Sequence, residues 1–266
     1  MPTRILSRRV AYVAAASCDG GAAVVKVSMP DGLVGNGDWA RELASVRLGQ
    51  GHGYVALLAF DVERRAMLLE RLGPPIAELA MPIEAQIDGI AATVQRGWRR
   101  PDDVRGWRTG ADQAAFLDRC FDEWWLSLGR PCPASVIDAA SAAVRRRRDA
   151  FDRGSAVLIH GDAHAWNVLA HPDGGYRLID PDGMLSEPAH DLAIPLRHWN
   201  DELLADPDPA ARVRSWCARL QGSTRADAQA TWEWALAERV STGLFLLRLG
   251  DESGAAYLEV ARRLAA

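Results

Sequence analysis

Two short polar segments near the middle of the chain carry the residue types that chemistry requires. The first reads His-Gly-Asp-Ala-His-Ala-Trp-Asn from 160 to 167, and the second reads Ile-Asp-Pro-Asp-Gly from 179 to 183. Asn167 and Asp180 offer an amide oxygen and a carboxylate oxygen, and oxygen atoms are the ligands that Mg²⁺ prefers. Asp162, five residues before Asn167, offers a carboxylate that can take a proton from a hydroxyl group. The two segments therefore supply a metal site and a general base, which are two parts of a site for phosphoryl transfer.

The basic residues show a strong bias that singles out one position. Of the 31 basic residues, 30 are arginine, and Lys26 is the only lysine. Because a solvated cation can be either residue, a position that stays lysine in this chain indicates a need for a compact ammonium group rather than a planar guanidinium. The alternative is that one lysine survived by chance.

The two polar segments together resemble the aminoglycoside phosphotransferases. The pattern His-Gly-Asp-x-His-x-x-Asn followed by Ile-Asp-Pro-x-Gly is typical of that family. The short hinge Met-Leu-Leu-Glu-Arg-Leu-Gly at 67–73 is most similar to the streptomycin and hydroxyurea resistance kinases within it. The similarity extends from Lys26 to about Asp191, beyond which the chain matches only as helices. It implies a two-lobed protein-kinase-like fold and a phosphotransferase that uses ATP and Mg²⁺.

The resemblance also implies a role for individual residues. Asp162 is expected to be the catalytic base, and Asn167 and Asp180 are expected to be the Mg²⁺ ligands. Lys26 is expected to contact the α- and β-phosphates of ATP while Glu42 holds it in place. A contact with the phosphates would explain why position 26 is lysine and not arginine.

Three further residues are expected to lie at the nucleotide, namely Glu70 and Leu72 in the hinge and Ser7 near the amino terminus. The fold normally places a strand and a phosphate-covering loop before the lysine. Residues 1–19 contain no glycine, and Ser7-Arg8-Arg9 is the only candidate for that loop. Either the loop uses a serine hydroxyl and backbone N–H groups, or the chain begins inside the first strand.

The histidines of the first segment have two interpretations. His160, Asp162 and His164 alternate along the chain and are residue types that bind metals, so they could form the site of a metal-dependent hydrolase. That interpretation leaves Asn167 and Asp180 without a role. We therefore expect His160 and His164 to brace the loop by hydrogen bonds. Asp191 is expected to be structural as well, either capping a helix or securing the loop.

Acidic residues are concentrated after the second segment, and this indicates the nature of the acceptor. The stretch from Asp180 to Asp208 contains eight acidic residues and one basic residue, Arg197. Such a charge excess favours a small cationic, hydroxyl-rich acceptor. The candidates for binding it are Asp182, Glu187 and Glu202.

Three functions other than antibiotic phosphorylation remain open at this stage. The preferred acceptor is an aminocyclitol antibiotic of the streptomycin type. A metabolic kinase for an amino sugar, choline or homoserine would share the same loop motif. The short amino terminus also allows a nucleotide-binding pseudoenzyme, and the metal-dependent hydrolase is the third alternative.

The elements expected around these residues form an α+β protein with two lobes. Lobe 1–73 should bind the nucleotide and end in a hinge at 70–73, and lobe 74–266 should be mainly helical and carry the catalytic loop and acceptor site. Asp38 is a good N-cap for the helix of the first lobe, and Gly49 is expected to end that helix. We expect strands at 10–16, 22–28, 54–60, 65–70, 156–159 and 176–179, and helices at 39–48, 83–98, 111–129, 134–151, 208–221, 225–249 and 253–265.

Composition excludes several classes of protein. The net charge of −4 and the pI of about 5.9 argue against nucleic acid as a partner. The apolar stretches are far shorter than the ~20 residues of a membrane span, and the first residues do not read as a leader, so we expect a cytoplasmic protein that does not bind membranes. Four widely spaced cysteines are expected to be reduced thiols.

Overall fold

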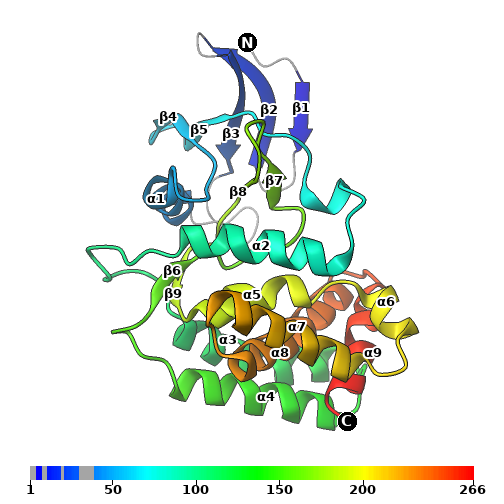
Figure 1. The fold of residues 1–266 in the computed structure, drawn as a ribbon. Coiled ribbons are helices and arrows are strands. Elements are labelled where there is room, and N and C mark those ends of the chain that lie inside the picture. The colour runs from blue at the N-terminus through cyan, green and yellow to red at the C-terminus, as the bar shows by residue number, and fades with distance from the viewer. Residues whose placement is uncertain (1–3, 8–10, 19–20, 30–38) are drawn as a thin grey trace.

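The computed structural model describes residues 4–7, 11–18, 21–29 and 39–266. Its first part is an antiparallel sheet with the strand order β1-β2-β3-β5-β4, and helix α1 lies beside it (Figure 1). This agrees with the small antiparallel sheet and single helix predicted for the first lobe. The elements are β1 (Arg4–Ser7), β2 (Ala11–Cys18), β3 (Gly21–Ser28), α1 (Trp39–Gly49), β4 (Leu57–Asp61) and β5 (Ala66–Glu70).

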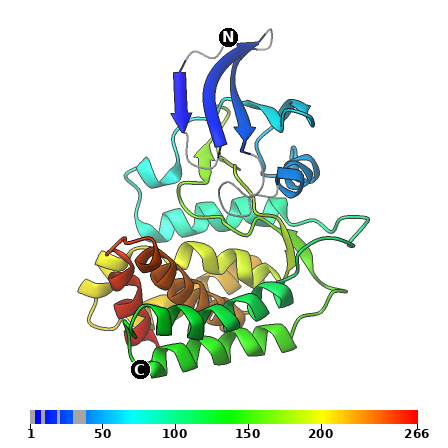
Figure 2. The same cartoon turned by 180° about the vertical axis from the view of Figure 1, so that it is seen from behind.

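The second part is mainly helical and lies below the sheet (Figure 1). Helix α8 is its centre, because α8 contacts α3, α4, α5, α7 and α9 and is buried over most of its length. Figure 2 shows α3 and α4 along the side that faces away in Figure 1. The helices are η1 (Ile76–Glu78), α2 (Ile83–Gly97), α3 (Gly110–Ser127), α4 (Ala134–Asp149), α5 (Pro188–Leu196), α6 (Asn200–Ala205), α7 (Pro209–Thr224), α8 (Ala228–Arg248) and α9 (Gly254–Leu264).

Two short antiparallel strand pairs hold the polar segments together. β6 (Val157–Ile159) pairs with β9 (Met184–Ser186), and β7 (Val168–Ala170) pairs with β8 (Tyr176–Leu178). The first polar segment joins β6 to β7, and the second joins β8 to β9. Backbone bonds from Ile179 N to Asn167 O (3.0 Å) and from Gly183 N to His160 O (3.1 Å) link the two segments directly. Both segments therefore lie at one place in the fold.

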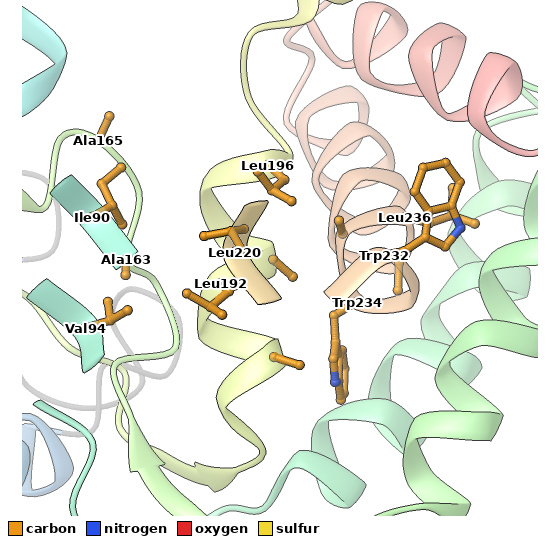
Figure 3. Close-up of a cluster of buried hydrophobic side chains, with 14 of the residues drawn as sticks. Ile90, Val94, Ala163, Ala165, Leu192, Leu196, Leu220, Trp232, Trp234 and Leu236 are labelled. Atoms are coloured by element: carbon orange, nitrogen blue, oxygen red, sulfur yellow. The ribbon is translucent and has the colours of Figure 1, made fainter. Parts of the chain in front are cut away.

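Apolar side chains of the first segment anchor it in the core. Ala163 is fully buried and Ala165 is nearly so, and both belong to the same cluster as Ile90 and Val94 of α2. Figure 3 shows these side chains close together, with Leu192 of α5 and the side chains of α7 and α8 farther into the helical part. The loop is thus fixed by burial as well as by hydrogen bonds.

Elements that the sequence patterns did not predict are short or fully buried. They are β1, β7, β9, η1, α5 and α6. Helix α5 is buried on nearly every side and contains Pro195, so it has no polar face and no amphipathic period to detect. A strand of three or four residues is too short to show an alternating pattern, and it forms because it pairs with another strand. β1 shows that a strand does precede β2.

Helix α1 ends at Gly49 as predicted, but the reason differs from the predicted cap. Gly49 is not in the left-handed region, whereas Gly51 has a φ of 76°. A Cβ atom on Gly49 would lie 2.1 Å from Cδ2 of Tyr54. Glycine is therefore needed at Gly49 to leave room for the buried ring of Tyr54. The predicted cap residue, Asp38, lies outside the described residues.

Among the described residues, no helix is long and apolar enough to cross a membrane.

Candidate active site

Asp162 lies at the centre of the first polar segment, with a partner on each carboxylate oxygen. Its Oδ1 accepts a bond of 2.6 Å from the guanidinium of Arg197 on the α5–α6 connection, and its Oδ2 lies 3.3 Å from Nε2 of His164. Asn167 donates from Nδ2 to the backbone oxygen of Asp162 at 3.0 Å. The carboxylate is half-buried, so it is held in place and still reachable. This arrangement suits a base that must meet an incoming hydroxyl group.

The neighbours of Asp162 determine its charge. Burial by itself would raise the pKa of this carboxyl, but the charge of Arg197 and the hydrogen bond with His164 outweigh burial and hold the pKa far below its usual range. Asp162 is therefore ionised throughout the physiological pH range.

Lys26 connects the sheet to the second polar segment. Its ammonium group on β3 lies 2.5 Å from Oε1 of Glu42 on α1 and 2.8 Å from Oδ1 of Asp180. Burial would lower the pKa of Lys26, but the charges of Asp180 and Glu42 outweigh it and raise the pKa. Burial raises the pKa of Glu42, which shares one ammonium group with Asp180. The predicted contact of Lys26 with Glu42 is present, while its role toward a nucleotide stays a prediction.

Asn167 and Asp180 have the properties of Mg²⁺ ligands. The amide nitrogen of Asn167 is used by Asp162, which leaves its oxygen as the atom for a cation. Asp180 is exposed at its tip and has a φ of 57°, a left-handed conformation that non-glycine residues adopt at a cost and that is frequent at functional sites. Within the described residues, no group of three or more His, Cys, Asp or Glu side chains is arranged to hold a metal. Two oxygen ligands without a complete protein cage fit Mg²⁺, which keeps waters and binds substrate phosphates.

His160 and Asp191 support the loop. Asp191 is fully buried and accepts from the backbone N–H groups of His160 (3.0 Å) and Gly161 (2.9 Å) and from the indole of Trp98 (2.9 Å). The ring of His160 donates from Nε2 to Ile179 O (2.8 Å) and accepts at Nδ1 from the backbone N–H of Asp162 (3.1 Å). Both nitrogens are occupied, so His160 is not available as a metal ligand, and the geometry gives the hydrolase interpretation no support.

The sequence matches the family model described as aminoglycoside/hydroxyurea antibiotic resistance kinase over residues 2–250. The chain belongs to that family. A streptomycin 6-kinase of Streptomyces glaucescens is 27% identical over 197 residues, which cover 74% of this chain and 61% of the relative. A hydroxyurea phosphotransferase of Kitasatospora aureofaciens is 29% identical over 186 residues, covering 65% of this chain and 49% of the relative. The chain thus matches only part of the length of these two relatives.

Solved structures of the same shape confirm the protein-kinase-like fold. The aminoglycoside phosphotransferase APH(4)-Ia, as a thermostable mutant in a ternary complex with AMP-PNP and hygromycin B, has a TM-score of 0.67 and 15% identity, covering 100% of this chain and 93% of its own. The choline kinase LicA from Streptococcus pneumoniae has a TM-score of 0.63 and 17% identity, covering 98% and 94%. At these identities the likeness concerns the fold alone.

The acidic residues after Asp180 in this family member are mostly engaged within the protein. Glu187 accepts from Nε1 of Trp234 at 2.8 Å and lies 3.4 Å from Arg147. Asp206 pairs with Arg212, and Asp208 caps α7. Glu202 is exposed on α6. Of the three predicted acceptor residues, Asp182 lines a pocket next to the loop. Three of the eight carboxylates in this stretch, those of Asp180, Glu187 and Asp206, form ion pairs with described residues of the protein.

The three further residues predicted to lie at the nucleotide, Glu70, Leu72 and Ser7, differ in their surroundings. Glu70 uses its carboxylate within the protein, accepting from Ala56 N (2.7 Å) and lying 3.2 Å from Nε2 of His171. Leu72 is buried in the segment that follows β5. Ser7 is the last residue of β1 and is paired with Val13. The side chain of Ser7, together with Arg8 and Arg9, lies outside the described residues, so the predicted phosphate-covering loop stays a prediction.

Arg197 is the main residue of the candidate site that the sequence patterns missed. Besides Asp162, it lies 3.5 Å from the buried carboxylate of Glu238 on α8, which in turn lies 3.1 Å from His190. Arg239 donates to the backbone oxygens on both sides of Arg197, at Leu196 (2.6 Å) and His198 (3.0 Å). A sequence signal did exist, because Arg197 is the single basic residue in the acidic stretch.

Proposed function

We propose that this protein is an O-phosphotransferase that uses ATP and Mg²⁺ to phosphorylate a hydroxyl group of a small molecule. One observation carries the proposal: the fold joins a carboxylate base, two oxygen ligands and a buried lysine held by a glutamate, although these residues are spread from Lys26 to Asp180. Residues 1–73 would form the nucleotide-binding lobe, and residues 74–266 would carry the catalytic loop and the acceptor site.

Each residue would have a defined part in the reaction. The acceptor oxygen forms a bond to the γ-phosphorus, the bond between that phosphorus and the β–γ bridging oxygen breaks, and ADP leaves. The hydroxyl proton passes to the carboxylate of Asp162, at Oδ2, because the contacts of Oδ2 with His164 (3.3 Å) and Asn167 (3.4 Å) are longer than the 2.6 Å bond of Oδ1 with Arg197. Lys26, held by Glu42, neutralises charge on the phosphates. When bound at Asn167 and Asp180, Mg²⁺ would orient the phosphates and neutralise part of their charge.

The acceptor we propose is an aminocyclitol antibiotic of the streptomycin type. The names of the curated relatives, streptomycin 6-kinase and hydroxyurea phosphotransferase, support an antibiotic. The alternative is a metabolic acceptor such as choline, an amino sugar or homoserine, which the similarity in fold to a choline kinase supports. Streptomycin is preferred because the relatives that carry that name were found by sequence, whereas the choline kinase shares 17% identity.

The test is a screen of ATP consumption over a panel of acceptors. Streptomycin, hydroxyurea, hygromycin B, choline, glucosamine and homoserine are each added to the full chain with ATP and Mg²⁺. We expect streptomycin to stimulate ADP release most and to gain a phosphate, detected by mass spectrometry. Stimulation by choline or homoserine alone would select the metabolic alternative, and no stimulation by any acceptor would support a pseudoenzyme.

The matched pair of variants for this screen is Asp162→Asn and Asp173→Asn. Both remove one carboxylate charge, but Asp173 is exposed in the turn between β7 and β8. Asp162→Asn should lower turnover by on the order of 10²–10⁴ while nucleotide binding is kept, because general-base catalysis contributes that much. Asp173→Asn should leave turnover unchanged. Equal turnover of the two variants would rule out Asp162 as the base.

A further inference from the structure

The imidazole ring of His164 faces the carboxylate that we propose as the base. Its Nε2 lies 3.3 Å from Oδ2 of Asp162, the oxygen that receives the hydroxyl proton in the reaction proposed above. The side chains of His164 and Asp162 are 20% and 30% exposed, so an incoming acceptor can reach both. The proposed reaction gives this ring no task of its own.

The loop itself determines which nitrogen of His164 carries a proton. The backbone N–H of Trp166 donates to Nδ1 of His164 at 3.2 Å. A backbone N–H can only donate, so Nδ1 must accept with its lone pair, and the ring carries its proton on Nε2. His164 therefore presents an N–H group, and not a lone pair, to Asp162.

This arrangement excludes two other roles for the ring. A general base and a metal ligand each need a free lone pair on a ring nitrogen. Nδ1 uses its lone pair for the N–H of Trp166, and Nε2 has none while it carries the proton. His164 can thus donate to Asp162, but it cannot take the hydroxyl proton itself.

The backbone on both sides of His164 is fixed. The N–H of His164 donates to the backbone oxygen of Asp162 at 2.8 Å, and the N–H of Asn167 donates to the backbone oxygen of His164 at 2.9 Å. The neighbouring side chains, Ala163 and Ala165, are buried in the core. The ring therefore starts from a backbone position that is tied to the proposed base and to a proposed metal ligand.

Two rings from later parts of the chain pack beside the imidazole. The ring of His198 lies edge-on to that of His164, with centroids 5.6 Å apart and an angle of 69° between the planes. Tyr257 of α9 lies in the same manner beside His198, at 6.4 Å and 76°. Burial and the charge of Arg197 lower the pKa of His198 to about 3, so this support adds no positive charge next to His164.

The two oxygens of the Asp162 carboxylate are held unequally. Oδ1 has the 2.6 Å bond from Arg197, whereas Oδ2 has longer contacts with Nε2 of His164 (3.3 Å) and Nδ2 of Asn167 (3.4 Å). Hydrogen bonds of catalytic groups are often long in a free enzyme and tighten when the substrate is bound. Oδ2 is thus kept in place loosely and retains a lone pair for the acceptor hydroxyl.

We propose that His164 is a positioning residue for Asp162, an Nε2–H donor that keeps Oδ2 turned toward the acceptor hydroxyl. The proposal rests on the proposed function, because that reaction gives Oδ2 its task. Without the ring of His164, the carboxylate would still be tied to Arg197 but could pivot on that one bond. A misplacement of about 1 Å can cost ~10² in rate.

The first test is independent of turnover and measures the protons of the ring. Long-range ¹H–¹⁵N NMR spectra of the full chain show which ring nitrogens carry a proton, and the signals of His164 are those that disappear in His164→Gln. We expect a proton on Nε2, and we expect the Nε2 signal to shift in Asp162→Asn. A lone pair on Nε2, or a signal that does not respond to Asp162→Asn, would overturn the proposal.

The second test compares the kinetics of His164→Leu, His164→Gln and His52→Leu. Glutamine keeps a side-chain N–H donor and leucine has none, and His52 is an exposed histidine that serves as the matched control. We expect His164→Leu to lower kcat by about tenfold to a hundredfold with an unchanged Kd for AMP-PNP. His164→Gln should recover most of this loss, and His52→Leu should match wild type.

A role in bracing the loop alone predicts a different result. His164→Leu and His164→Gln would then lose kcat equally, in proportion to a fall in melting temperature, and this outcome would contradict the positioning role. If wild type phosphorylates no acceptor, the proposed function fails, and the NMR measurement still decides whether His164 donates to Asp162.

Discussion

The charge of Asp162, the carboxylate that we propose as the base, depends on a residue 35 positions away in the chain. Arg197 donates to Oδ1 of Asp162 at 2.6 Å and is itself held by Glu238 and by the backbone contacts of Arg239. Burial of Asp162 favours its neutral form, and the charge of Arg197, followed by the hydrogen bond with His164, outweighs burial and keeps this carboxyl ionised. We therefore expect Arg197 to position and charge Asp162. The pH dependence of kcat/KM distinguishes this role from a contribution to folding alone.

Replacing Arg197 should shift the pH dependence of the reaction. In Arg197→Gln the pKa of Asp162 should rise, because burial remains while the compensating charge is lost. The acid limb of the kcat/KM profile should then move to higher pH by at least about one unit. Arg197→Lys should restore part of the shift, which a purely structural role would not predict. An acid limb that is the same in Arg197→Gln and wild type would contradict this role.

The lone lysine allows a second prediction at the scale of single residues. Lys26 is buried between Glu42 at 2.5 Å and Asp180 at 2.8 Å, and a planar guanidinium is too wide for this space. Lys26→Arg should lower the ATP-dependent rate by about 10², the cost of a misplacement of about 1 Å. Arg64→Lys, at an exposed ion pair, should have no effect.

A double-mutant cycle tests whether Lys26 and Glu42 act as one unit. Glu42→Gln should lower the rate less when Lys26→Arg is already present than it does in wild type. If the two losses simply multiply, the two residues act independently in the reaction despite their contact.

At the scale of elements, α1 and the loop 160–167 meet through one aromatic ring. Tyr54 is buried against the end of α1, and its ring stacks on that of His160 with centroids 5.8 Å apart. His160 in turn holds the backbone of Asp162 and of Ile179. The end of α1 is therefore coupled to the loop by packing.

Gly49→Ala tests this packing. The added methyl group would lie 2.1 Å from the ring of Tyr54, so the ring or α1 must move. We expect a loss of about 1–3 kcal/mol in the free energy of unfolding, the usual cost of overpacking, measured by urea denaturation. Gly222→Ala on α7 is the matched control, because nothing lies within 4 Å of its added Cβ atom and alanine favours helices. Equal stability of the two variants would show that Tyr54 adapts freely.

At the scale of the whole molecule, a partly buried histidine makes stability depend on pH. Burial, together with the charge of Arg197, lowers the pKa of His198 to about 3. The folded protein therefore keeps His198 neutral, while the unfolded chain takes up a proton below about pH 6.5. The free energy of unfolding should fall as the pH decreases below that value, by about 1 kcal/mol per pH unit from this group.

His198→Gln isolates the contribution of this group. The variant should show a smaller loss of stability between pH 6 and pH 4 than wild type, in urea denaturation at each pH. The main-chain oxygen of His198 still accepts from Arg239 in the variant, so the turn is kept. Identical pH dependence in wild type and variant would show that His198 is not the titrating group.

Much of this molecule is readable from local sequence. The loop from His160 to Asn167, the residues proposed as metal ligands and most of the longer helices depend on residues that are near one another in the chain. Lys26 stands out from the composition of the whole chain. A helix with one polar face repeats its pattern every few residues, and a catalytic loop keeps its residues at fixed spacing, so both leave a signal in the sequence.

Only the tertiary structure decided which distant residues complete the site. Lys26 meets Asp180 across 154 residues, and Asp162 meets Arg197 across 35. Helix α5 and the three-residue strands form because they are buried or paired with other elements. Their own sequences carry no periodic pattern from which they could be predicted. The presence of Arg41 and Arg108 in the lining of one pocket likewise depends on how α1 packs against the helical lobe. Contacts of this kind are determined by packing, because a side chain's partners are whatever the folded chain places beside it.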